Sequence, residues 1–108
     1  MSDEPQAVPR FEWKPLTRPG CRGVESRLLV ARQELVLSML RFQPGGTIDE
    51  HAADHPVDVI CLEGSGFISL EGRTHRFAAG HSMLWPPGLL HRLWTDRHQM
   101  LTLMSERP

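Results

Sequence analysis

Short runs of apolar and β-branched residues, separated by turn residues, fill the chain from about residue 24 onward. These runs lie at residues 27–32, 34–43, 57–63, 67–70, 73–77, 82–85, 89–94 and 99–104. Their lengths are typical of strands, and no stretch has the 3.6-residue periodicity of a helix. Pro44-Gly45-Gly46 is expected to end the second run, and Glu71-Gly72 to form a tight hairpin turn. Eight or nine such strands predict an all-β sandwich or barrel.

Several of these runs are apolar on both faces of the expected strand. In residues 34–43, Leu37 and Met39 alternate with Leu40 and Phe42, so large apolar side chains point both ways. A strand with one face in water should instead alternate between apolar and polar residues. We therefore expect both faces of this sheet to be covered. In so short a chain the simplest cover is a second copy packed sheet to sheet, which predicts a homodimer.

The first 20 residues differ in composition from the rest of the chain. They carry Pro5, Pro9, Pro15 and Pro19. This content predicts an extended arm at residues 1–20, partly disordered before about residue 9, and a single barrel domain at residues 21–108. Phe11 and Trp13 share the same parity, so the alternative to a loose tail is an edge strand or a strap over the core.

Composition and charge exclude several classes of partner. The 108 residues are 40% hydrophobic with a net charge of −1, whereas proteins that bind nucleic acid or anionic membranes present a basic surface. No apolar run approaches the roughly 20 residues of a membrane-spanning helix. The polar start of the chain does not resemble a signal peptide, and Cys21 and Cys61 are a poor basis for a disulfide framework. We expect a cytoplasmic protein.

The segment from Gly80 to His91 is the most distinctive motif. An apolar run at residues 82–85 is followed by Pro86-Pro87-Gly88, which cannot continue a sheet ladder, and then by His91 on the returning strand. This spacing places His91 at a fixed offset from a sharp turn. It resembles the second signature motif of the cupin family, with Gly80, Pro86, Gly88 and His91 all matching.

A second region extends the resemblance to cupins over roughly residues 34–104. The first cupin motif is Gly, five residues, His, one residue, His, three or four residues, an acid, six residues and Gly. Gly45, His51 and Gly64 fall on this pattern. The resemblance implies an all-β, cupin-type double-stranded β-helix, also called a jelly-roll barrel. It also implies a divalent transition metal held inside the barrel by the motif's histidines and acid.

The metal-binding positions implied by the resemblance are incomplete here. His51 and His91 match the first and last histidines, but Ala53 and Val57 stand where a histidine and the acid belong. His55, which shares the parity of His51, is a candidate displaced ligand. Asp58 would need a bulge to turn inward, because an offset of one residue reverses the face of a strand. The expected metal ligands are His51, His91 and His55, and the alternative is a metal-free pair of imidazoles in a polar pocket.

The expected pocket is better defined than its contents. If His91 points into the barrel, Leu89 and Leu93 accompany it, and Val57, Val59 and Cys61 accompany His51 by the same alternation. An apolar cavity with a few imidazoles is typical of a small-molecule site. Three functions remain open: a metal-dependent oxygenase, isomerase or decarboxylase acting on a small organic acid or phenol; a metal-free binding or sensor protein; and a dimeric structural module with a vestigial pocket.

Overall fold

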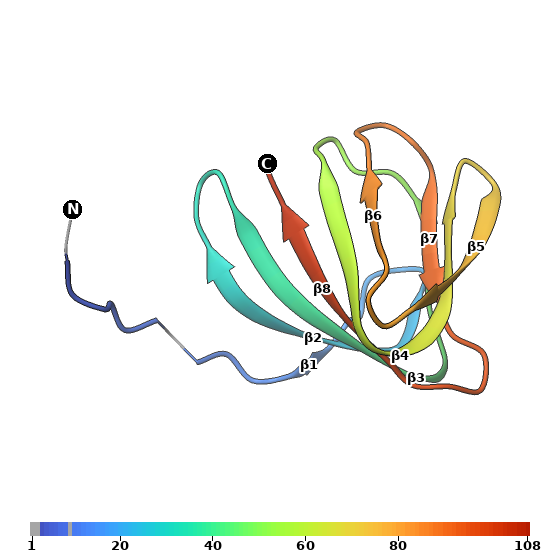
Figure 1. The fold of residues 1–108 in the computed structure, drawn as a ribbon, viewed down its shortest axis with the longest axis horizontal. Coiled ribbons are helices and arrows are strands. Elements are labelled where there is room, and N and C mark those ends of the chain that lie inside the picture. The colour runs from blue at the N-terminus through green and yellow to red at the C-terminus, as the bar shows by residue number, and fades with distance from the viewer. Residues whose placement is uncertain (1–2, 9) are drawn as a thin grey trace.

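The computed structural model describes residues 3–8 and 10–108 and is built from strands (Figure 1). The strands form one eight-stranded sheet that closes into a barrel, which confirms the expected all-β barrel. They are β1 (Lys14–Pro15), β2 (Cys21–Ala31), β3 (Val36–His51), β4 (Val57–Leu70), β5 (Arg73–Ala78), β6 (Ser82–Trp85), β7 (His91–Trp94) and β8 (Met100–Glu106). Each pairing between neighbouring strands is antiparallel.

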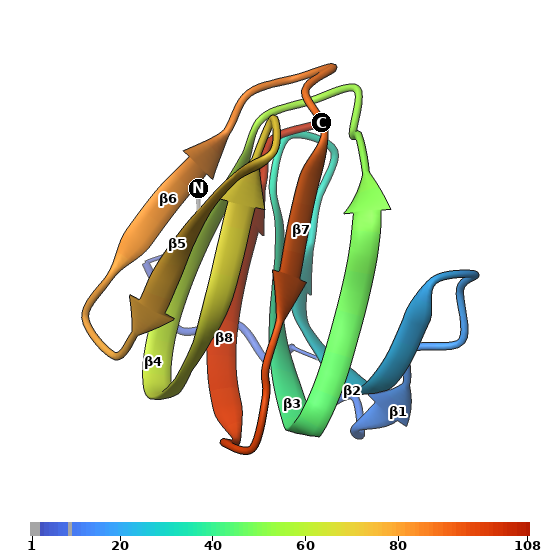
Figure 2. The ribbon, with the colours of Figure 1, turned by 90° about the vertical axis from the view of Figure 1, so that its right-hand side faces the viewer.

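Two long strands, β3 and β4, contribute to both halves of the barrel. The first half of β3 pairs with β8 and its second half with β7, and β4 divides in the same way. Figure 2 shows β7 between the ends of β4 and β3, while β8 lies between the same two strands in the other half. The two halves of the sheet are therefore joined through β3 and β4.

The prediction that Pro44-Gly45-Gly46 ends a strand is wrong, because β3 continues through these residues to His51. β4 likewise continues through Gly64-Ser65-Gly66. A Cβ on Gly46 would lie 2.6 Å from the carbonyl oxygen of Gly23, and one on Gly64 would overlap the carbonyl of Gln99. These glycines allow the close backbone approach that a bend in a barrel strand requires. They redirect the strands rather than end them.

Both predicted turns are present. Glu71 and Gly72 both have positive φ, 49° and 78°, which is the signature of a tight type I′ hairpin turn between β4 and β5. Gly88 has φ of 79° and follows the two prolines between β6 and β7. The second turn brings the chain back so that β7 begins at His91.

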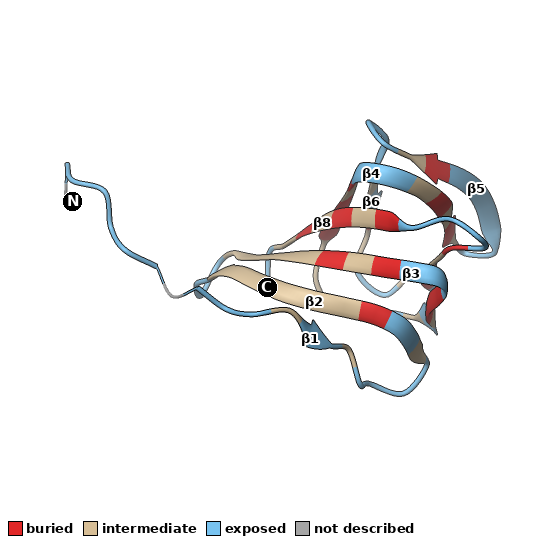
Figure 3. Cartoon of the chain, turned by 90° about the horizontal axis from the view of Figure 1, so that it is seen from below, coloured by how far each residue is buried: buried red, intermediate tan, exposed pale blue. Residues whose placement is uncertain are grey.

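The core lies inside the barrel and follows the alternation of the strands. Along β4, Val57, Val59 and Cys61 are buried, and along β7, His91 and Leu93 are buried, as the sequence predicted. Leu89 is only partly buried. The same alternation appears as red and tan bands along β3 and β8 in Figure 3. The barrel interior is therefore filled from alternate positions, as in other small barrels.

The proline-rich arm is attached to the barrel near its end. β1 pairs with Glu25 and Ser26 of β2, and the indole of Trp13 lies under the guanidinium of Arg41 at 4.2 Å. In Figure 1 the preceding residues lead away from the barrel. Of the predicted disorder before residue 9, the part at residues 1–2 lies outside the described residues, as does Pro9. In the described parts of the chain no helix is long and apolar enough to cross a membrane.

Candidate functional site

His51 and His91 meet inside one end of the barrel, as the sequence predicted. His51 is the last residue of β3 and His91 the first of β7, and the two are register partners. Their Nε2 atoms are 3.2 Å apart, and the rings are nearly perpendicular, at 81°. Two histidines that are 40 positions apart in the sequence therefore form a single pair of facing imidazoles.

A one-residue bulge in β3 produces this pairing. Ile48 pairs with Leu93 and His51 with His91, so three steps along β3 match two steps along β7. In a regular strand Ile48 and His51 would face opposite sides of the sheet. The extra residue restores His51 to the inner side, on which Ile48 is buried.

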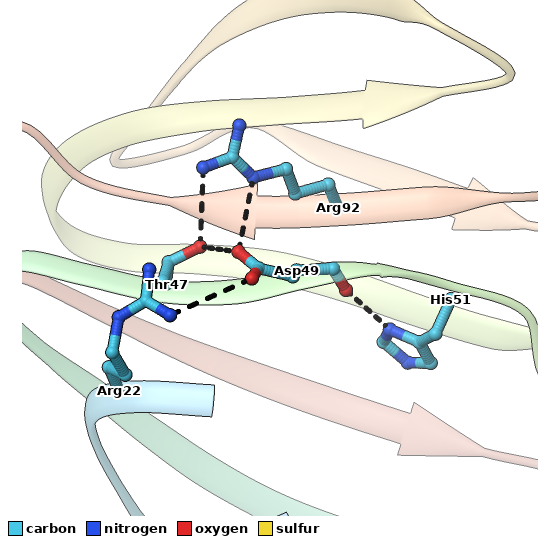
Figure 4. Close-up of polar contacts among 5 residues, drawn as sticks. All are labelled: Arg22, Thr47, Asp49, His51 and Arg92. Carbon is cyan, nitrogen blue, oxygen red and sulfur yellow. Dashed lines mark hydrogen bonds and ion pairs between the residues drawn. The ribbon is translucent and has the colours of Figure 1, made fainter. Parts of the chain in front are cut away.

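Asp49, inside this bulge, holds the segment in place (Figure 4). Its amide donates to the carbonyl of Gly20 at 2.8 Å, and its side chain accepts a hydrogen bond from the Thr47 hydroxyl at 2.8 Å. The guanidinium groups of Arg22 and Arg92 each lie 3.8 Å from its carboxylate. The bulge is thus fixed on its outer side by two hydrogen bonds and two cations.

The backbone of Asp49 also fixes the tautomer of His51. The Nδ1 atom of His51 lies 2.9 Å from the Asp49 carbonyl oxygen (Figure 4). A carbonyl oxygen only accepts hydrogen bonds, so Nδ1 carries the proton and, in the neutral ring, Nε2 carries the lone pair. The lone pair of His51 therefore lies on the atom that faces His91.

His91 is the more buried member of the pair. It is 1% exposed, and its ring stacks on the indole of Trp85 with 3.8 Å between centroids and 4° between planes. Burial, with a smaller contribution from the charge of His51, lowers the pKa of His91 to about 4. His91 is therefore neutral near pH 7. Its Nδ1 atom is buried and has no hydrogen-bond partner in the described part of the chain.

The pair faces a cavity of about 430 Å³. Its walls combine apolar groups with the two imidazoles and with charged side chains. The residues that define its character are Arg18, His51, His55, Val57, Trp85, His91, Met104 and Glu106. This volume and lining are in the range of small-molecule sites.

His55 lines the same cavity but is held apart from the pair. Its Nε2 atom is 2.8 Å from a Glu106 carboxylate oxygen and its Nδ1 atom 2.7 Å from one of Asp54. The hydrogen bond to Glu106, and next the one to Asp54, raises the pKa of His55. An imidazolium donates from both nitrogens and has no lone pair for a metal. A role for His55 as third ligand stays a prediction, and it requires that the ring release one carboxylate.

Asp58 does not turn inward. β4 is regular from Val57 to Ile60 in its pairing with both β6 and β8, so no bulge changes the face of Asp58. Its carboxylate instead lies 3.2 Å from the guanidinium of Arg107. Val57 is buried at the position where the motif has its acid, and Ala53 packs against the core. Neither can be a metal ligand.

The His51–His91 pair alone matches half of a metal site. Two imidazole nitrogens bound tetrahedrally to one zinc ion at about 2.05 Å would lie about 3.3 Å apart, close to the observed 3.2 Å. His51 donates its Nδ1 proton to a backbone carbonyl, as a metal-ligating histidine usually does with the ring nitrogen that is not bound to the metal. Over residues 3–8 and 10–108, however, no group of three His, Cys, Asp or Glu side chains is assembled around one point.

Sequence reasoning missed three residues that shape the site. Trp85 ends the apolar run at residues 82–85, and nothing in that run marks it as the stacking partner of His91; its register partner Val57 gives the signal, because both are buried on the same side. Asp49 was hidden because a bulge leaves no clear mark in the sequence. Glu106 carries no motif and reaches His55 from the last strand.

Comparisons with known proteins identify the fold. A family model described as "Cupin domain" matches residues 38–105. The polyketide cyclase RemF from Streptomyces resistomycificus is 22% identical, with a TM-score of 0.86 over 96% of this chain and 80% of that one. An RmlC-like cupin from Shewanella frigidimarina is 21% identical, with a TM-score of 0.81 over 91% and 84%.

KdgF from Halomonas sp. is 16% identical, with a TM-score of 0.76 over 94% of this chain and 96% of that one. No curated protein matches the chain. At these identities the similar structures share the fold, and one fold carries many chemistries. The activity of any of them is therefore not transferred to this chain.

Proposed function

Because the chain belongs to the cupin family, we propose that it binds a small organic ligand in the cavity beside the His51–His91 pair. The observation that carries this proposal is a cavity whose lining combines apolar side chains with the facing imidazoles of His51 and His91. A site of this kind takes up an apolar body and orients it by a few polar contacts.

The state of the two imidazoles indicates the polar group of the ligand. His91 is neutral near pH 7, and His51 presents a nitrogen lone pair on the side of the pair. A pair of this kind both donates and accepts hydrogen bonds, so it complements a hydroxyl or a carboxylic acid. We therefore propose a small phenol or organic acid as the ligand class, without a permanent positive charge.

A panel of phenols and small carboxylic acids tests this proposal. Their binding is measured by thermal shift and by NMR. At least one compound should raise the melting temperature of the wild-type protein and lose most of this effect in His51→Ala and in His91→Phe. The phenyl ring of His91→Phe keeps a stacking partner for Trp85. His75→Ala, which removes an exposed histidine of β5, is the matched control and should respond like the wild type. Equal responses in all variants would overturn the proposal.

A second candidate is a metal-dependent site at the same position. The 3.2 Å separation of the two Nε2 atoms and the carbonyl bond of His51 favour it. His51 and His91 would hold the metal, and the third protein ligand would be His55 after release of one carboxylate. A bound divalent metal would act as a Lewis acid on an oxygen of the ligand. The enzyme and the metal-free binding protein therefore differ in whether a divalent metal is bound at His51 and His91.

Metal content separates the two candidates. Protein purified without nickel resin and without added metal should be measured by elemental analysis, together with His51→Ala, His91→Ala and His75→Ala. Stoichiometric metal in wild type and His75→Ala, lost in both site variants, would establish the metal site. Equal metal content in wild type and the His51→Ala/His91→Ala double variant would exclude it. If the protein binds the ligand but contains no metal, the metal-free binding protein is the function that stands.

A further inference from the structure

The loop that joins β1 to β2 is a closed turn that begins at Arg18. Pro19 and Gly20 occupy its two central positions, and Gly20 has φ of 82°. The amide of Cys21 donates to the carbonyl oxygen of Arg18 at 3.1 Å. Proline followed by a glycine of positive φ is the signature of a type II turn. The backbone of Arg18 is therefore fixed by the turn.

This turn is attached to the bulge of β3 that positions His51. The carbonyl oxygen of Gly20 accepts the hydrogen bond of 2.8 Å from the amide of Asp49, and Figure 2 shows the loop beside the second half of β3. On the other side of the turn, the amide of Leu16 donates to a carbonyl oxygen of β2 at 2.9 Å, and its side chain packs against the core. The loop that carries Arg18 is thus held on both sides.

The side chain of Arg18 lines the cavity beside the His51–His91 pair, and it also lines a neighbouring groove of about 280 Å³. Among the described residues, Arg18 is the only arginine or lysine in the lining of the cavity. Its guanidinium forms no ion pair within the same part of the chain. An exposed cation with no protein partner therefore stands at the candidate site.

The carboxylates of the cavity already have a partner. Glu106 and Asp54 lie 2.8 and 2.7 Å from the two ring nitrogens of His55. The acids of the neighbouring groove, Asp49 and Glu50, do not belong to the lining of the cavity. Within the described residues, the guanidinium is thus the one charge of the cavity that its own lining does not match.

We propose that Arg18 binds a carboxylate of the ligand, while the His51–His91 pair contacts a hydroxyl group at the other end. This inference rests on the proposed function and narrows its ligand class to hydroxylated organic acids. A guanidinium presents a planar fork of donors that matches the two oxygens of a carboxylate. The imidazole pair both donates and accepts hydrogen bonds and so suits a hydroxyl. A carboxylate is ionised at pH 7, and its charge compensates that of Arg18.

Two matched pairs of probes test the role of Arg18. They are 4-hydroxybenzoate with 4-hydroxybenzamide, and 4-hydroxyphenylacetate with 4-hydroxyphenylacetamide, so that each carboxylate is compared with a neutral amide of similar shape. By calorimetric titration at low salt, the wild type should bind at least one carboxylate about tenfold more tightly than its amide. Addition of about 0.5 M salt should reduce this preference, because the charge of an exposed arginine is screened.

Variants of Arg18 separate its charge and its shape. Arg18→Gln should weaken binding of the carboxylate about tenfold and leave binding of the amide within about twofold of the wild type. Arg18→Lys keeps the charge without the planar fork and should recover part of the loss. Arg10→Gln is the matched control, because it makes the same change of charge at another exposed position of the arm, and it should bind like the wild type.

The outcomes distinguish this inference from the proposed function. If the wild type binds the amides as tightly as the carboxylates, or if Arg18→Gln keeps the wild-type preference, Arg18 does not bind the carboxylate, although the cavity still takes up small molecules. Equal weakening of both members of a pair by Arg18→Gln would likewise overturn the inference. If the wild type binds none of the four compounds, the inference and the proposed ligand class fail together.

Discussion

The two outer sides of the barrel differ in how their apolar side chains are covered. In one half, the outer side presents the partly buried side chains of Met39, Ile60, Leu101 and Leu103, which we name the aliphatic wall. In the other half, Phe67 and Trp94 stack with 5.6 Å between centroids, and Arg92 lies over the Trp94 ring at 4.1 Å. We name this second surface the arginine wall, defined by Phe67, Arg92 and Trp94.

The difference shows which side of the barrel is complete in a single chain. Arg92 covers an aromatic ring and also faces Asp49, so the arginine wall is both covered and charge-paired by its own residues. The His51–His91 pair lies on the inner side of this half. The aliphatic wall has no comparable cover. We therefore expect changes on the arginine wall to affect folding and the site, and changes on the aliphatic wall to affect association.

The largest effect is expected from His91, on the inner side of the arginine wall. Its pKa is about 4 in the folded chain and about 6.5 in the unfolded chain, so between these values the unfolded chain binds more protons. Stability should therefore fall as the pH drops from about 6.5 towards 4, by roughly 3 kcal/mol in total.

Urea denaturation at pH 7 and at pH 4.5, at one protein concentration, measures this loss. His91→Phe cannot titrate, so its stability should depend less on pH over this window than that of the wild type. Other groups, including His55, titrate in both proteins and cancel in the difference. Identical pH dependence in the two proteins would show that His91 is not the responsible group.

Trp94→Ala should be the next largest change. It removes the ring that packs on Phe67 and supports Arg92, and we expect a loss of about 2 kcal/mol, below the range for a fully buried tryptophan. The dimer dissociation constant should stay within about twofold of the wild type, because Trp94 is on the other wall. Denaturation and sedimentation of the same variant check both statements, and a weaker dimer would contradict the division between the walls.

Asp49→Ala should have a smaller effect on stability but a specific effect on the site. It removes one hydrogen-bond acceptor and two half-exposed ion pairs, at a cost of about 1 kcal/mol. With the bulge released, the Nδ1 proton of His51 should exchange faster with water. Nitrogen NMR of the imidazoles measures this, and Asp49→Asn, which keeps an acceptor for Thr47, should largely restore the wild-type spectrum. A spectrum unchanged by Asp49→Ala would refute the positioning role.

The smallest effect on folding is expected from Met39→Thr on the aliphatic wall. The side chain points outward and threonine suits a strand, so unfolding of the monomer should change by less than about 0.5 kcal/mol. Dimerisation should nevertheless weaken, since Met39 contributes apolar surface to the sheet face through which the sequence predicts a homodimer. Denaturation at concentrations below and above the dissociation constant separates the two effects. A large loss in the monomer would place Met39 in the core instead.

The strands, the turns and the inward direction of His91 were predictable from the sequence because they depend on local patterns. Alternation of apolar residues marked the buried positions of β4 and β7, and proline and glycine marked the turn before His91. The separation of 40 residues between the two histidines was bridged by family spacing, not by physical reasoning. Each of these signals lies within one segment or one motif.

The rest depended on contacts between segments. Counting alternate residues fails at the bulge between Ile48 and His51, where one extra residue inverts the parity of everything that follows. The same reasoning predicted that His55 would face His51, but Glu106, 51 residues away, holds its ring. Glycines at the bends of β3 and β4 look identical in sequence to glycines that end strands. Only the close approach of Gly46 to Gly23 distinguishes them.

The bulge at Asp49 and Glu50 has a consequence for how this site can change between related sequences. A substitution at His51 removes one imidazole and leaves the strand as it is. Loss of Asp49 or Glu50 would leave a regular β3 ladder in which the histidine stands two steps from Ile48, so its imidazole would still face the inside of the barrel. A gap of one residue at this position is therefore compatible with a retained histidine pair, because it removes the bulge and not the imidazole.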